Sequence, residues 1–148
     1  MQHYHDIKGK LAKLLATEDL VVEHKQVDTA QFNVDTRVLT LPTWKISDND
    51  VYDSLVAHEV GHALYTPARE WFAEKKYQGV PMAFVNITED VRIEKLMKRR
   101  YAGLAKCFYT GYNELNDQDF FDIDGKDLTN FNLADRVNLY FKVGAWND

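Results

Sequence analysis

Residues 54–67, SLVAHEVGHALYTP, hold two of the chain's five histidines four residues apart, with a glutamate directly after the first. Side chains four apart lie over one another on one side of a helix, so the imidazoles of His58 and His62 can converge on one zinc ion. Glu59 is turned about 100° around the axis, which keeps it off the ion but beside a water bound there. The alternative is a helix whose two buried histidines are satisfied by backbone carbonyl groups.

The same residues predict a buried helix from about Asn49 to Tyr65. Ser47, Asp48 and Asn49 are candidate N-caps, and Pro67 ends the helix. Its apolar side chains lie nearly all round the axis, as expected of a central helix. Gly61 costs about 1 kcal/mol relative to alanine, so we expect another segment to approach the helix closely beside the histidines.

A third ligand is expected from residues 86–100, NITEDVRIEKLMKRR. The apolar side chains of Ile93, Leu96, Met97 and Tyr101 define the buried face of a helix predicted over about Asn86–Ala102. Glu89 and Asp90 straddle that face, and Asn86 and Glu94 lie near it. Carboxylates beside a core need a partner, which a metal ion supplies. The alternative is a solvated helix start whose acids complement the helix dipole.

These two motifs resemble the gluzincin-type zincin metallopeptidases. HEVGHALYTP followed by NITEDVRIEKLMKRRYAGL is more closely similar to phage-encoded metallopeptidase-like proteins related to the cobaltochelatase-subunit-like proteins. The resemblance extends to RVLTLP before the motifs and to GYNEL and DRVNLYFKVG after them. It implies a hydrolase of the metalloprotease type with a zincin-like fold, acting on a peptide or protein substrate in the cytoplasm of the host cell.

The resemblance also implies roles for single residues. His58 and His62 would be zinc ligands, Glu59 the general base, and Glu89 most simply the third ligand. Gluzincins often carry a further acid four residues beyond that glutamate, where this chain has Ile93. Asp90, which has Glu94 four residues on, is therefore an alternative ligand; otherwise Asp90 or Glu94 would hold a histidine Nδ1–H.

Two further expectations concern substrate binding. Tyr109 or Tyr112 could donate a hydrogen bond to the oxyanion, although core packing is the alternative for both. The strand RVLTLP is expected to form the sheet edge along which an extended peptide adds by backbone pairing, as the resemblance implies.

The remaining sequence predicts one α+β domain over residues 1–148. Three strand-like runs, 20–27, 30–34 and 37–42, predict a small antiparallel β-meander with a tight turn at Asp35-Thr36. Further helices are expected over residues 6–17, 69–78 and about 132–143, the last ending at Gly144, and GVPMAF (79–84) is expected to be a loop or extended. The acidic loop at 116–127 fails the EF-hand register, because Gly125 at position six puts Phe120 at position one.

Composition narrows the possible partners. The net charge of −5 excludes an electrostatic case for nucleic acid or an anionic membrane. The lone Cys107 fits a reducing compartment and is expected to be a buried structural thiol. No signal peptide or run of eighteen apolar residues is present, so we expect a cytoplasmic protein.

Two other functions remain open from the sequence. A catalytically silent zincin-fold module could act through a partner such as an AAA-type ATPase, which the cobaltochelatase-like resemblance suggests. Alternatively the fold could be a scaffold that binds no metal. Glu59 favours the enzyme, since a purely structural zinc site has no use for a base and commonly has four protein ligands.

Overall fold

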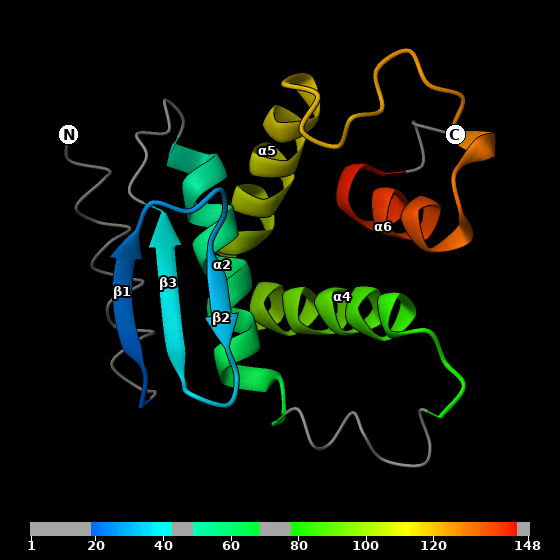
Figure 1. Cartoon of the computed structure of the whole chain (residues 1–148). Coiled ribbons are helices and arrows are strands. Elements are labelled where there is room, and N and C mark those ends of the chain that lie inside the picture. The colour runs from blue at the N-terminus through cyan, green and yellow to red at the C-terminus, as the bar shows by residue number, and fades with distance from the viewer. Residues whose placement is uncertain (1–18, 43–48, 69–77, 145–148) are drawn as a thin grey trace.

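The computed structural model describes residues 19–42, 49–68 and 78–144. They form an α+β structure, which confirms the expected class (Figure 1). The elements, in order, are β1 (Val21–Lys25), β2 (Gln31–Asn33), β3 (Val38–Pro42), α2 (Asn49–Tyr65), α4 (Met82–Arg100), α5 (Gly103–Asp117), the short 3₁₀ helix η2 (Leu128–Asn130) and α6 (Leu133–Val143). The helix predicted over 6–17, nearly all of that predicted over 69–78, and the candidate caps Ser47 and Asp48 lie outside the described residues.

The three strands form a mixed sheet in the order β1-β3-β2. Strand β3 pairs with β1 in parallel and with β2 antiparallel. The predicted antiparallel meander is therefore wrong, and so is the expectation that RVLTLP lies at a sheet edge. The most apolar strand takes the middle position because this buries Leu39 and Leu41, whereas β1 is largely exposed.

The turn between β2 and β3 forms where it was predicted. The side chain of Asn33 accepts hydrogen bonds from the backbone N–H groups of Asp35 and Thr36, both at 3.0 Å. Arg37 follows with a φ of 59° and donates its N–H to the Asn33 carbonyl. This side-chain-stabilised turn sets the register in which Phe32 faces Leu39.

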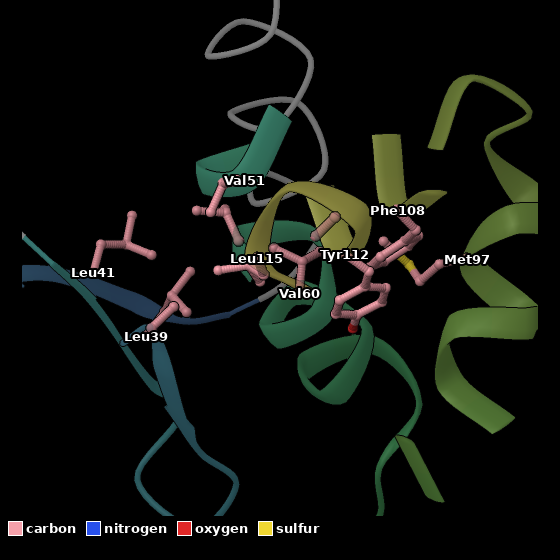
Figure 2. Close-up of a cluster of buried hydrophobic side chains, with 11 residues drawn as sticks. Leu39, Leu41, Val51, Val60, Met97, Phe108, Tyr112 and Leu115 are labelled. Carbon is pink, nitrogen blue, oxygen red and sulfur yellow. The ribbon is translucent and has the colours of Figure 1, made fainter. Parts of the chain in front are cut away.

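Helix α2 has the predicted bounds and lies at the centre of the molecule. It packs against β2 and β3 on one side and against α4 and α5 on others (Figure 1). Figure 2 shows the core that results: side chains from β3, α2, α5 and α4 form one continuous apolar cluster from Leu41 to Met97. The helix expected to be apolar nearly all round is thus buried by its neighbours.

Helix α4 begins earlier than expected, at Met82 instead of about Asn86. Pro81 occupies the N-cap position, where its missing N–H costs nothing, so the helix includes the end of GVPMAF. It ends at Arg100, and the cations Lys98, Arg99 and Arg100 occupy its last turn, where they complement the helix dipole.

Close approach of α4 explains the glycine in α2. A Cβ placed on Gly61 would lie 2.8 Å from Cδ1 of Ile93 and 3.1 Å from Cγ of Met97. The expectation that Gly61 marks a close contact beside the histidines is confirmed. The contact brings the middle of α4, where the acidic residues lie, against the middle of α2.

Helices α5 and α6 complete the described structure. Gly111 of α5 faces α2, where an added Cβ would lie 2.8 Å from the Asp50 carbonyl oxygen. Asn132 caps α6 by accepting the Asp135 N–H, and Gly144 ends it with a φ of 89°. Both α4 and α5 contact α6. No helix in the described ranges has an apolar stretch long enough to span a bilayer.

Candidate metal centre

His58 and His62 lie one turn apart in the middle of α2, and their imidazoles face one another. The ring centroids are 4.8 Å apart, and the two Nε2 atoms are separated by 3.2 Å. Both side chains are mostly buried. The helix alone produces this pairing, as the spacing in the sequence predicts.

Asp90 of α4 completes a triangle with the two imidazoles. Its Oδ1 atom lies 3.2 Å from Nε2 of His62 and 3.6 Å from Nε2 of His58. The three residues form a group able to hold a metal ion. Ligand atoms about 2.1 Å from a tetrahedral zinc lie about 3.4 Å from one another, so the observed spacing fits an ion of this kind with little adjustment. Within residues 19–42, 49–68 and 78–144, no fourth such ligand joins the group.

The outer nitrogens of the two rings are held by hydrogen bonds. Nδ1 of His58 lies 2.8 Å from Oε1 of Glu94, and Nδ1 of His62 lies 2.7 Å from Oγ1 of Thr66. The Thr66 hydroxyl donates its own proton to Glu89, at 2.7 Å. Glu94 and Thr66 therefore act as acceptors, so both Nδ1 atoms carry a proton and both Nε2 lone pairs point into the triangle.

This arrangement concentrates electron pairs at one place. Two imidazole lone pairs and a carboxylate oxygen converge with no hydrogen-bond donor between them. Such a group of acceptors is stable only when a proton or a cation lies among the three atoms. Burial lowers the pKa of His62, but its hydrogen bond to Asp90 and the charge of Glu59 outweigh burial and raise that pKa above 6.5. Without a metal, a proton on His62 relieves the repulsion; a divalent cation relieves it more fully.

Glu59 lies beside this group and outside it. Burial raises the pKa of its carboxyl above 4.5, while the two histidines oppose the rise. The backbone of Phe32 in β2 also acts to lower the pKa of this carboxyl, which is the smallest of these influences. A buried carboxylate whose pKa is raised accepts a proton more readily than a solvated one.

The structure places Glu89 differently from the simplest prediction. Its carboxylate accepts two hydrogen bonds from Arg92, each at 2.7 Å, in addition to the one from Thr66. Burial raises the pKa of Glu89, but the hydrogen bonds from Arg92 and Thr66 outweigh this and lower it below 4.5. Arg92 also donates to the Tyr65 carbonyl at 2.6 Å, which ties the end of α2 to α4. The geometry thus favours the alternative ligand, Asp90, whereas Glu89 accepts the hydrogen bond of the Thr66 hydroxyl.

Glu94 lies behind His58 and is itself surrounded by partners. The Tyr112 hydroxyl donates to its Oε1, and Nζ of Lys142 lies 3.8 Å from the same atom. Burial raises the pKa of Glu94, but the hydrogen bond with His58 and the charge of Lys142 reverse this and lower it. Glu94 is therefore an ionised acceptor for the His58 Nδ1–H, which is the role expected of either Asp90 or Glu94.

The two tyrosines expected near the site have different surroundings. Tyr109 is 69% exposed on the outer side of α5, away from the described group. Tyr112 is buried, and its ring stacks at 6.0 Å on Phe108. The Tyr112 hydroxyl already donates its hydrogen bond to Glu94, and Tyr109 faces solvent. The geometry therefore favours neither tyrosine as an oxyanion donor.

Sequence reasoning missed three residues of the surrounding network: Thr66, Arg92 and Lys142. Thr66 was detectable, because it lies one helical turn after His62. Arg92 stands three residues after Glu89, at helical pairing distance, but the same spacing occurs on many solvated helices. Lys142 carried no signal, since a lysine in a last helical turn is explained by the dipole.

In the acidic loop after α5, the carboxylates accept hydrogen bonds from within the loop itself. Oδ1 of Asp119 accepts the N–H groups of Ile123 and Asp124, and Asp127 caps η2 through Thr129. Lys126 pairs with Asp122. These acids therefore serve as turn and cap acceptors.

Cys107, in α5, is half-buried, with its Sγ 3.7 Å from the Asp50 carbonyl oxygen.

Comparison with known proteins adds nothing to the geometry. No protein-family model, no curated protein and no solved structure is significantly similar to this chain. The resemblance drawn from the two motifs stays a prediction, and the case for a function depends on the site itself.

Proposed function

We propose that the protein is a zinc-dependent metallopeptidase with His58, His62 and Asp90 as the zinc ligands. The observation that carries this proposal is the triangle of ligand atoms, with edges of 3.2, 3.2 and 3.6 Å, beside the buried carboxylate of Glu59. Three protein ligands leave a fourth position for water, which is the pattern of catalytic zinc sites. Glu89, the ligand that sequence resemblance favoured, is replaced in the proposal by Asp90.

The chain's own residues divide the work. Zinc, when bound, would lower the pKa of a water to about 7 and would polarise the carbonyl group of the peptide bond to be cleaved. The Glu59 carboxylate would then take a proton from a water held at this position and deliver it to the leaving amine. Its burial, which raises its pKa, makes it a better proton acceptor than a solvated glutamate.

The proposed peptide site is the edge of β2. Of the described strands, β2 is the outer one on the α2 side, and its Phe32 backbone lies close enough to Glu59 to influence the pKa of that carboxyl. An extended peptide that pairs with this edge lies next to the general base, so strand addition would bring a scissile bond to the metal position. This replaces the central strand β3 as the predicted docking edge.

The test combines zinc analysis with cleavage of casein, a substrate without stable structure. We expect about one zinc per chain and casein cleavage that a chelator abolishes. Glu59→Gln should keep the zinc and lose activity about a hundredfold or more, because general-base catalysis contributes about that much. The matched control is Asp117→Asn, an exposed acid at the end of α5, which should change neither.

Two results would contradict the proposal. A chain that retains no zinc and melts at the same temperature with and without chelator has no metal centre. Zinc-loaded protein whose cleavage of casein is absent, or insensitive to Glu59→Gln, would instead favour a silent binding module that acts with a partner.

A further inference from the structure

A buried chain of hydrogen bonds runs from the metal triangle to the last helix. It passes from His58 in α2 through Glu94 in α4 and Tyr112 in α5 to Lys142 in α6. The His58–Glu94 step is 2.8 Å, and Nζ of Lys142 lies 3.2 Å from the Tyr112 hydroxyl oxygen. Each of the four helices thus contributes one residue.

The chemistry of the partners fixes the direction of every proton in this chain. A lysine ammonium only donates, so the Tyr112 oxygen accepts from Lys142 and must direct its own proton to Glu94. Ionised Glu94 only accepts, so it receives protons from both Tyr112 and Nδ1 of His58. The lone pair of His58 is thereby left on Nε2, facing His62 and Asp90.

Burial makes the chain sensitive to the loss of any member. Glu94 and Tyr112 are each 6% exposed, and the Lys142 ammonium lies 4.7 Å from the centre of the Tyr112 ring. Buried polar groups of this kind are stable only while their partners are present. Two cations also compete for Glu94: Lys142 at 3.8 Å and Lys98 at 4.0 Å.

We propose that Tyr112 is a positioning residue, oriented by Lys142, that holds the Glu94 carboxylate on His58 and so keeps the Nε2 lone pair of His58 directed at the metal position. Without the hydroxyl, Lys142 and Lys98 are free to draw the carboxylate away from the imidazole. His58 then samples the other tautomer, in which Nε2 carries the proton and cannot bind metal. The inference rests on the proposed function only for the identity of the metal.

The test compares Tyr112→Phe with Tyr109→Phe. Both remove one hydroxyl from α5, but Tyr109 is exposed and takes no part in the row of hydrogen bonds from His58 to Lys142. Long-range proton–nitrogen NMR spectra of the metal-free protein report the tautomer of His58 directly. We expect Nδ1–H alone in the wild type and in Tyr109→Phe, and a mixture in Tyr112→Phe. Zinc affinity, measured by competition with a chromophoric chelator, should fall about tenfold in Tyr112→Phe only.

Two substitutions of Lys142 separate the effect of its charge from the effect of its hydrogen bond to Tyr112. Loss of a cation near two carboxylates would by itself tighten zinc binding, whereas loss of positioning weakens it. We expect Lys142→Met to weaken zinc binding and to mix the His58 tautomers. Lys142→Arg, which keeps a charged donor, should restore the wild-type spectrum.

Unchanged His58 signals in Tyr112→Phe would overturn the inference, and tighter zinc binding in Lys142→Met would assign Lys142 an electrostatic role instead. The NMR measurement uses metal-free protein, so it is independent of catalysis. If casein is not cleaved but Tyr112→Phe mixes the tautomers, the proposed function fails while the positioning role stands.

Discussion

At the scale of the residue, the candidate site depends on which of two adjacent acids reaches the imidazoles. Glu89 and Asp90 are separated by about 100° around α4, so they cannot both face the same point. Asp90 lies beside both Nε2 atoms, and Glu89 faces Thr66 and Arg92. The shorter side chain faces the two imidazoles, and the longer one accepts the hydrogen bond of Thr66, whose oxygen contacts Nδ1 of His62.

This difference predicts unequal effects of two similar substitutions. Asp90→Asn removes a charged ligand and should weaken zinc binding by about a hundredfold or more. Glu89→Gln acts on the site only indirectly, through Thr66 and Arg92, and should cost about tenfold. Zinc affinity measured by chelator competition distinguishes them. The reverse order would restore Glu89 as the ligand.

A second prediction concerns Glu89 and pH. Its pKa is lowered in the folded protein, so its ionised form stabilises the fold above pH 4.5, and this contribution is lost as pH falls through the lowered value. In chelated protein above pH 4.5, Glu89→Gln should reduce the free energy of unfolding by about 1–3 kcal/mol. Below pH 4.5 that difference should shrink, as measured by urea unfolding. A difference independent of pH would contradict the ion pair with Arg92.

Individual residues were predictable where spacing along one helix decided the geometry. His58, Glu59 and His62 are an example, since they need only the helical repeat. The choice between Glu89 and Asp90 was not, because it depends on the rotation of α4 about its axis, which the contact at Gly61 sets. Lys142 lies 48 residues beyond Glu94 in the sequence, and no local pattern joins them.

At the scale of the element, the junction of α2 with α4 controls the site. Ile93, which would meet a side chain at Gly61, is fully buried and lies between Asp90 and Glu94 in the sequence. Any shift of this contact moves both acids relative to the histidines. The packing of one helix pair therefore serves the core and the site together.

Gly61→Ala tests this junction. Crowding against Ile93 and Met97 should cost about 1–3 kcal/mol, offset by about 1 kcal/mol of helix propensity, so the net loss in free energy of unfolding is up to about 2 kcal/mol. Zinc affinity should fall in parallel. Gly103→Ala is the control, because nothing lies within 4 Å of its added Cβ, and it should be neutral or slightly stabilising. Equal effects of the two variants would contradict the role of the contact.

Element boundaries and element pairing differ in how far the sequence reveals them. The bounds of α2 follow from local signals such as Pro67, and the α6 end from Gly144. Strand order does not, because the β1–β3 pairing joins residues 17 apart and skips the neighbouring strand. Adjacent strands with a tight turn favoured a meander, but burial of Leu39 and Leu41 placed β3 between the other two.

At the scale of the whole molecule, the proposed ion adds a further connection between two helices that already meet through the apolar contact at Gly61 and through hydrogen bonds such as that of His58 with Glu94. Ligands come from α2 and α4 only, and α5 and α6 hold these helices in place. A ligand that binds only the folded chain stabilises it by mass action. Metal binding and global stability should therefore be coupled.

Chelation should lower the melting temperature. At free zinc about 1,000 times the dissociation constant, binding contributes about 4 kcal/mol, which corresponds to roughly 10 °C for a chain of this size. Differential scanning calorimetry with and without chelator measures the shift. His58→Ala, which removes a ligand, should melt at a temperature that chelator does not change; a wild type equally indifferent to chelator would exclude a metal centre.

The linkage of His58 to Lys142 has a consequence for biosynthesis. A ribosome delivers the sheet, then α2 and α4, and only much later the lysine of α6. During that interval the two imidazoles already exist, but one of them lacks its full support. If Lys142 orients Tyr112 as proposed, metal binding should therefore reach its full affinity only after α6 has been synthesised and has docked.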